Sequence, residues 1–149
     1  MIGIIVTGHG LFAYGIEKAV ERIIGEQPQV AYVNFPIESS TEILQQQLAD
    51  AIAEVDQGDG IVFFTDLLGG TPFRTAALLS HEMENCEVLT GINLQMTIET
   101  MLERDEKGMT VAKFRELALK FGQRGMTSLH DELAAKQAAV ATVEEDDGI

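Results

Sequence analysis

Short apolar runs rich in β-branched residues alternate along this chain with stretches in which apolar residues recur at helical spacing. The runs predicted to form strands cover residues 1–6, 30–35, 61–64 and 87–89, of which the last is short and begins with Glu87. The helical stretches cover residues 11–24, 43–55, 71–83, 94–102 and 111–121. Strands joined by helices of this length cannot form hairpins, so the pattern predicts an α/β fold with a mostly parallel sheet. We expect a three-layer, doubly wound arrangement with helices on both faces of the sheet.

The C-terminal part of the chain is less regular. Residues 126–129 are compatible with either a short strand or the start of a helix, because their apolar spacing does not distinguish the two. From Ala134 the chain is rich in alanine, and an acidic run covers residues 144–147. We therefore predict one domain over residues 1–133 and a solvated or frayed acidic tail over residues 134–149.

The charge of the chain excludes several classes of partner. Acidic residues outnumber basic ones by 24 to 10, which gives a formal net charge of −14. Nucleic acids and anionic membrane surfaces both require a basic binding face, so neither is an expected partner. A protein with a basic docking face would instead be favoured, mainly through a faster rate of encounter.

The cysteine count and the hydropathy pattern predict a cytoplasmic protein. Cys86 is the only cysteine, so neither an intrachain disulfide nor a thiolate metal cluster is expected. No apolar run approaches the roughly 20 residues of a bilayer span, and no cationic segment precedes the first apolar run. We expect no metal ion and no cofactor.

Polar and glycine residues follow the predicted strands, at the edge of the sheet where α/β proteins bind their ligands. Thr7-Gly8-His9-Gly10 comes after the first apolar run, and Asp66 follows the third. In a sheet with strand order 2-1-3-4, the first and third strands are neighbours, so His9 and Asp66 are expected to lie side by side. A carboxylate that accepts the Nδ1 proton of a histidine fixes its tautomer and leaves Nε2 free as a nucleophile.

The residues around this pair indicate what the histidine would carry. The glycines on either side of His9 remove side chains, so that a bulky group can approach its ring. The segment from Gly69 to Thr71 leads into a predicted helix N-terminus, whose free N–H groups and dipole favour an anion. Together these features are typical of a histidine that holds a phosphoryl group. The predicted site consists of the catalytic residues His9 and Asp66 and the phosphate-binding residues Gly10, Gly69, Gly70 and Thr71.

Other functions remain open on these residues alone. The segment from Gly8 to Ala13 fits the glycine pattern of dinucleotide-binding loops, so a nucleotide- or flavin-binding module is an alternative. Such a site would also require an acid at the end of the second strand, where this chain has a proline at position 36. A non-catalytic regulatory domain of the same fold is a third possibility. The other histidines, His81 and His130, are expected to be surface or core residues.

Three segments together resemble enzyme IIA of the mannose-type sugar phosphotransferase system (PTS). They are Thr7 to Gly10, Thr65 to Phe73 and Thr90 to Leu94, and the resemblance covers roughly residues 1–133 in order and spacing. Details such as Leu67-Leu68 and the segment from Arg124 to Leu129 look more like the N-acetylgalactosamine branch than the mannose enzyme.

The resemblance implies a phosphocarrier, a phosphotransferase with a phosphohistidine intermediate. In the family, phospho-HPr donates a phosphoryl group to Nε2 of a histidine near the N-terminus, which passes it to enzyme IIB for sugar uptake through the membrane components IIC and IID. His9 matches that histidine, Asp66 matches the acid that orients it, and Thr71 matches a hydroxyl near the phosphoryl oxygens.

The resemblance also implies an assembly. The family forms homodimers that exchange a C-terminal antiparallel strand, and residues 126–129 occupy the corresponding place. Because no IIB-like segment follows in this sequence, IIB is expected on a separate chain.

Overall fold

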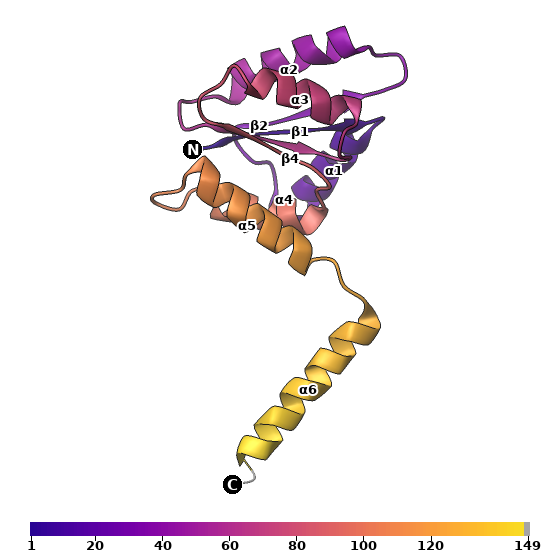
Figure 1. The fold of residues 1–149 in the computed structure, drawn as a ribbon, viewed down its shortest axis with the longest axis vertical. Coiled ribbons are helices and arrows are strands. Elements are labelled where there is room, and N and C mark those ends of the chain that lie inside the picture. The colour runs from indigo at the N-terminus through magenta and orange to yellow at the C-terminus, as the bar shows by residue number, and fades with distance from the viewer. Residues whose placement is uncertain (148–149) are drawn as a thin grey trace.

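The computed structural model describes residues 1–147 and consists of a parallel sheet between two layers of helices (Figure 1). The strands are β1 (Gly3–His9), β2 (Val30–Phe35), β3 (Ile61–Thr65) and β4 (Cys86–Leu89). They lie in the order β2-β1-β3-β4, and every neighbouring pair is parallel. The α/β fold class, the parallel sheet and the strand order that the sequence predicts are confirmed.

The helices form the outer layers. They are α1 (Phe12–Ile24), α2 (Thr41–Val55), α3 (Thr71–Ser80), α4 (Leu94–Glu103), α5 (Val111–Arg124) and α6 (Leu129–Asp147). One face of the sheet is covered by α2 and α3, and the other by α1, α4 and α5 (Figure 1). Across residues 1–147, no helix is both long enough and apolar enough to span a bilayer.

The central strands are buried because both of their faces are apolar. In β1, Ile4 and Val6 pack against α1, α4 and α5, whereas Ile5 packs against α2 and α3. In β3, Phe64 and Phe63 divide between the same two clusters. Strands of this kind belong in the middle of a parallel sheet. Their carboxyl ends, and the segments that follow them, are thereby brought to one edge of the sheet.

The opposite, amino-terminal edge of the sheet is held by a buried arginine. Arg104 follows α4, is 3% exposed, and donates to the carbonyl oxygens of Ile2 (3.3 Å), Gln29 (3.3 Å) and Pro28 (2.7 Å). Burial lowers the pKa of this guanidinium from its ordinary value. Because the guanidinium has several donors in one plane, a single side chain joins the start of the chain to the segment before β2.

The structure decides between strand and helix at residues 126–129. Residues 126–128 are irregular and α6 begins at Leu129, so this segment is not a strand in the single chain. The reason is local, because the Ser128 hydroxyl oxygen accepts the N–H of Asp131 at 3.1 Å, as in a helix N-cap. Helix α6 extends away from the other elements (Figure 1), and its side chains are exposed over residues 129–142. The division into a domain over residues 1–133 and a tail over 134–149 stays a prediction, and residues 148–149 lie outside the described part.

Candidate functional site

The site lies where β1 and β3 end at the carboxyl edge of the sheet. His9 is the last residue of β1, and Asp66 directly follows Thr65, the last residue of β3. The register pairs Thr7 of β1 with Thr65 of β3, so the residues that follow them in the two strands lie close to each other. The predicted contact between His9 and Asp66 is confirmed, across 57 positions in the sequence.

One carboxylate oxygen of Asp66 holds both the main chain and the ring of His9. Oδ2 accepts the main-chain N–H of His9 at 2.9 Å and lies 2.9 Å from Nδ1 of the ring. An ionised carboxylate can only accept, so Nδ1 carries the proton and Nε2 has the free lone pair. The Asp66 side chain is 15% exposed and that of His9 44%, so the acid is covered while the ring reaches solvent.

Two further contacts define where the ring lies. A Cβ atom placed on Gly70 would be 2.6 Å from Cε1 and 3.3 Å from Nε2 of His9, so the main chain of Gly70 lies directly against the ring. The ring of Phe35, at the end of β2, meets the His9 ring edge-on, with centroids 6.0 Å apart and planes at 73°. The imidazole is therefore surrounded by the ends of three neighbouring strands.

The two glycines beside His9 have different surroundings. The prediction that both leave space for a bulky group at the ring is wrong for Gly8. Gly8 is buried, and a Cβ there would lie 2.5 Å from Cδ1 of Phe12, so its missing side chain makes room for α1 and not for a ligand. Gly10 has φ +59°, and a Cβ there would meet no atom within 4 Å. The N–H of Gly10 already donates to the carbonyl of Phe35 at 2.8 Å. Gly10 thus leaves the surface beside His9 open without offering a main-chain donor.

The loop between β3 and α3 ends in a helix N-terminus beside the ring. Its turn is closed by the N–H of Gly70, which donates to the carbonyl of Leu67 at 3.1 Å. The N-cap of α3 is Gly70, which keeps extended backbone angles, and Thr71 is the first helical residue. Since Pro72 has no N–H, the first N–H groups of α3 that lack a partner within the helix belong to Thr71 and Phe73.

The residues predicted to bind phosphate therefore contribute unequally. The N–H groups of Gly10 and Gly70 are used inside the protein. Gly69 has φ +77°, which lets the loop turn toward α3 at no steric cost. Thr71 brings both a main-chain N–H and a hydroxyl to the start of α3. Of this set, Thr71 has the groups best suited to hold an anion.

The segment after β4 and the other histidines lie apart from this chemistry. Asn93 Oδ1 accepts the N–H of Met96 at 2.9 Å, and Asn93 Nδ2 donates to the carbonyl of Gly122 at 2.8 Å, which joins α4 to α5. His81, just after α3, and His130, in α6, are both exposed surface residues.

Exposed apolar side chains border the site, and the sequence did not identify them as a possible contact surface. The apolar rim, as we call it, consists of Leu11, Ile37, Leu67 and Leu68, whose residues are 64%, 96%, 60% and 74% exposed. Each follows His9, Phe35 or Asp66 by one or two positions. Apolar residues in loops have no periodicity to reveal them, although their position just after predicted site residues was a usable signal. A cluster of exposed apolar side chains is typical of a surface that contacts another protein.

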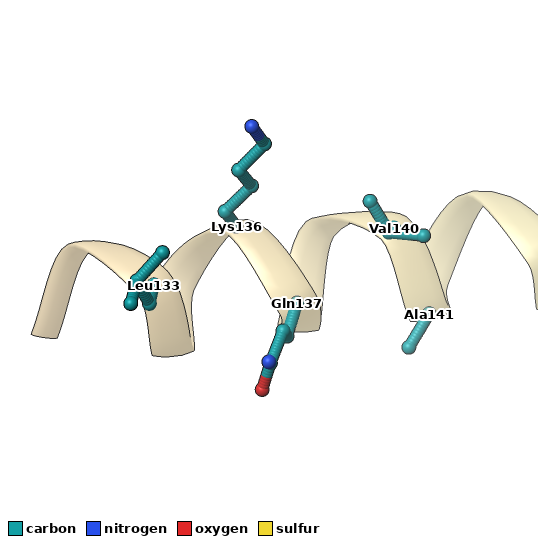
Figure 2. A pocket seen from close by; sticks show the side chains of 5 residues that line it. All are labelled: Leu133, Lys136, Gln137, Val140 and Ala141. Atoms are coloured by element: carbon teal, nitrogen blue, oxygen red, sulfur yellow. The ribbon is translucent and has the colours of Figure 1, made fainter. Parts of the chain in front are cut away.

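A shallow hollow elsewhere lies along α6 and is lined by Leu133, Lys136, Gln137, Val140 and Ala141 (Figure 2). All five side chains come from one helix, so the hollow does not enclose a small molecule. Among the side chains that the structure describes, those of residues 1–142, no three His, Cys, Asp or Glu are grouped so as to hold a metal ion. Within the described chain, the His9–Asp66 pair is therefore the strongest candidate for a reactive centre.

Comparisons with known proteins agree with this geometry. Residues 3–118 match the EIIA-man family, described as the PTS system fructose IIA component. The chain is 36% identical over 129 residues to the enzyme IIA component YadI of Escherichia coli K12, with 87% of each chain covered. It is 30% identical over 137 residues to the mannose-specific EIIAB component of the same organism, covering 92% of this chain and 42% of that protein.

A solved structure extends the likeness to three dimensions. The PTS component EIIA from Streptococcus agalactiae has a TM-score of 0.81 and 32% identity, with 88% of this chain and 99% of that chain covered. From the family match, the sequence identities and this shared fold, we conclude that the chain belongs to the EIIA-man family of PTS enzyme IIA components, which are phosphocarriers.

Proposed function

We propose that this chain accepts a phosphoryl group from phospho-HPr on Nε2 of His9 and passes it to an enzyme IIB on a separate chain. The observation that carries the proposal is the 2.9 Å contact between Nδ1 of His9 and Asp66, which leaves Nε2 as the exposed nucleophile. In the transfer, the lone pair of Nε2 forms a bond to phosphorus while the bond from phosphorus to the donor atom of phospho-HPr breaks. The ring keeps its Nδ1 proton and gains positive charge, which the carboxylate of Asp66 stabilises.

The phosphoryl oxygens are held at the start of α3. The main-chain N–H and the hydroxyl of Thr71 supply donors there, and the helix dipole favours the added negative charge. Gly69 shapes the loop that presents these groups, and Gly10 keeps the surface beside the ring open. Gly70 lies against the ring itself.

The donor and the acceptor are proteins, because the site is an open surface with the apolar rim around it. A small-molecule site would enclose most of its ligand, whereas the His9 side chain is 44% exposed. The net charge of −14 favours partners with a basic docking face, in agreement with an HPr-dependent relay in the cytoplasm. The alternative of a dinucleotide site is disfavoured, because Pro36 stands directly after β2, where such a site needs an acidic residue.

Mass spectrometry of the intact protein tests the first step. After incubation with phosphoenolpyruvate, enzyme I and HPr, we expect one added phosphoryl group that is stable at neutral pH and lost in acid. His9→Gln should remain unmodified, and the matched control His81→Gln, which changes an exposed histidine outside the site, should be modified like the wild type. Modification of His9→Gln would overturn the proposal.

The second step separates a carrier from a regulatory domain of the same fold. Phosphorylated protein, freed of HPr, should transfer its phosphoryl group to a cognate IIB and return to its original mass. The details at Leu67-Leu68 and residues 124–129 favour an N-acetylgalactosamine-type IIB, which then drives sugar uptake through IIC and IID. Retention of the phosphoryl group with every mannose-family IIB offered would favour the regulatory role instead.

A homodimer is also proposed, through an exchanged strand from residues 125–129. In the described sheet β4 is an edge strand with β3 as its neighbour, and a strand from a partner would cover this edge. Exchange requires residues 126–129 to leave the irregular and helical conformation of the single chain. Sedimentation at micromolar concentration should show a dimer, and truncation after Gly125 should yield a monomer. This truncation keeps the Asn93–Gly122 hydrogen bond, and a dimer that survives it would contradict the exchange.

A further inference from the structure

Gly69 and Gly70 are adjacent, but they are glycines for different reasons. Gly69 has φ +77°, and a Cβ there would meet no atom within 4 Å, so only its backbone angle calls for glycine. Gly70 has φ −72° and ψ 167°, an extended conformation that any residue adopts. A Cβ at Gly70 would nevertheless lie 2.6 Å from Cε1 of His9. The severest contact is with the ring, since the next obstacle, the carbonyl oxygen of Leu67, would lie 3.3 Å away, and the backbone angles of Gly70 exclude nothing.

The ring has little freedom to avoid such a side chain. Cε1 is bonded to both ring nitrogens, and Nδ1 is already held 2.9 Å from Asp66 Oδ2. The Phe35 ring lies near the imidazole, with centroids 6.0 Å apart. A Cβ at Gly70 would be about 0.8 Å short of the 3.4 Å at which ordinary contact begins. A ring shift of that size away from Asp66 would lengthen the Nδ1 contact beyond hydrogen-bond distance.

We infer that Gly70 is a positioning residue for His9, because its missing side chain lets the ring lie with Nδ1 on Asp66 and Nε2 toward solvent. Its importance for phosphoryl transfer rests on the proposed function, whereas its effect on the ring does not. Gly70 acts through His9, since its own N–H is occupied by the carbonyl of Leu67.

Nitrogen NMR of the His9 ring in unphosphorylated protein tests the inference directly. The wild type should show the proton on Nδ1. In Gly70→Ala, the ring signals should move toward a mixture of the two tautomers, as for a ring detached from Asp66. Gly15→Ala is the matched control, because a Cβ at that exposed position of α1 meets no atom within 4 Å, and its ring signals should equal those of the wild type. Unchanged ring signals in Gly70→Ala would overturn the inference.

The urea denaturation midpoints of the wild type, Gly70→Ala, His9→Ala and the double variant distinguish a clash with the His9 ring from a general disturbance of the loop. Gly70→Ala should lower the midpoint of the wild type but lower that of His9→Ala far less or not at all. The ring is then gone, only the 3.3 Å approach to the Leu67 carbonyl oxygen remains, and alanine suits the extended backbone of this position. Equal lowering in both backgrounds, or none in the wild type, would contradict a role through His9.

Phosphorylation kinetics with phospho-HPr give the functional readout. Gly70→Ala should lower the maximal rate at least tenfold while the concentration of phospho-HPr at half-maximal rate stays within twofold, since the ring moves and the apolar rim does not. If the wild type itself accepts no phosphoryl group, the proposed function fails, and the NMR and urea results still decide the role of Gly70. A wild-type rate in Gly70→Ala would show that the ring position does not limit transfer and would overturn the positioning role.

Discussion

Replacement of Asp66 by asparagine separates the two tasks that its carboxylate performs at His9. Oδ2 accepts from both the main-chain N–H and the ring Nδ1–H, whereas Oδ1 is buried with no hydrogen-bond partner among the described residues. If the asparagine amide group turned its NH₂ toward His9, that NH₂ would face the main-chain N–H, donor against donor. The amide oxygen therefore takes the place of Oδ2, and the Nδ1–H tautomer is kept.

The loss is then one of charge, and its size follows from the geometry. Two unit charges about 4 Å apart attract by about 4 kcal/mol at the effective dielectric constant near a protein surface. Only part of a charge develops on the ring in the transition state, and the ring is 44% exposed, so we expect about half of that energy or less. A loss of about 1.5–2 kcal/mol corresponds to phosphorylation slowed by about 10- to 30-fold. Where the tautomer itself is lost, an Asp→Asn change costs far more, about 10⁴-fold in a catalytic triad.

Rapid-quench kinetics with phospho-HPr and nitrogen NMR of the ring measure the two effects separately. Asp66→Asn should react about 10- to 30-fold more slowly than the wild type with its ring proton still on Nδ1. Asp66→Ala, which frees the ring as well, should be slower still and show mixed tautomers. Asp50→Asn removes the same charge from an exposed position on α2 and should react at the wild-type rate. A rate for Asp66→Asn within twofold of the wild type, or a wild-type ring with its proton on Nε2, would refute the reasoning.

Three further predictions concern stability and reactivity away from the site. Arg104→Met removes three hydrogen bonds from a buried guanidinium to main-chain carbonyls, one of them buried and two partly buried, and should lower the free energy of unfolding by about 3 kcal/mol in urea titrations. A loss below about 1 kcal/mol would contradict the role of Arg104 in holding the amino-terminal edge of the sheet. Burial raises the pKa of Tyr32 from 10.0 to about 12, so the folded protein favours the protonated phenol more strongly than the unfolded chain does. This contribution to stability is complete below pH 10 and should be lost as the pH rises from 10 to 12. Over that range the urea midpoint of the wild type should fall more steeply than that of Tyr32→Phe. Burial also raises the pKa of the Cys86 thiol from 9.0 to about 11, which lowers the fraction of reactive thiolate at pH 8. A thiol reagent should therefore label the folded chain about 100-fold more slowly than the urea-unfolded chain. Equal labelling rates would contradict the burial of Cys86.

The elements and the central pair of the site could be predicted from the sequence because they depend on local patterns. The run 61–64 is hydrophobic at every position and the run 1–6 at every position except Gly3, which marks strands buried on both faces. Once the strand order 2-1-3-4 is assumed, the positions of His9 and Asp66 at the strand ends place them together. The order itself is confirmed by the pairing of β1 with both β2 and β3.

Features that depend on contacts between distant residues could not be predicted in this way. At Gly8 and at Gly70 a side chain would clash with a residue that is close in space, namely Phe12 at Gly8 and His9 at Gly70. The engagement of the Gly10 N–H by Phe35 depends likewise on where β2 ends. At residues 126–129, helical capping by Ser128 decides the conformation of the single chain, and the apolar spacing carries no sign of it.

The separation of His9 and Asp66 by 57 positions determines when their contact can form during synthesis and folding. The pair cannot form until β1 and β3 are joined, and this closes a loop that contains α1, β2 and α2. A nascent chain that has not yet extended beyond β3 has the histidine but not the acid that sets its tautomer. Any reactivity of His9 that depends on its contact with Asp66 is therefore acquired only with the completed sheet.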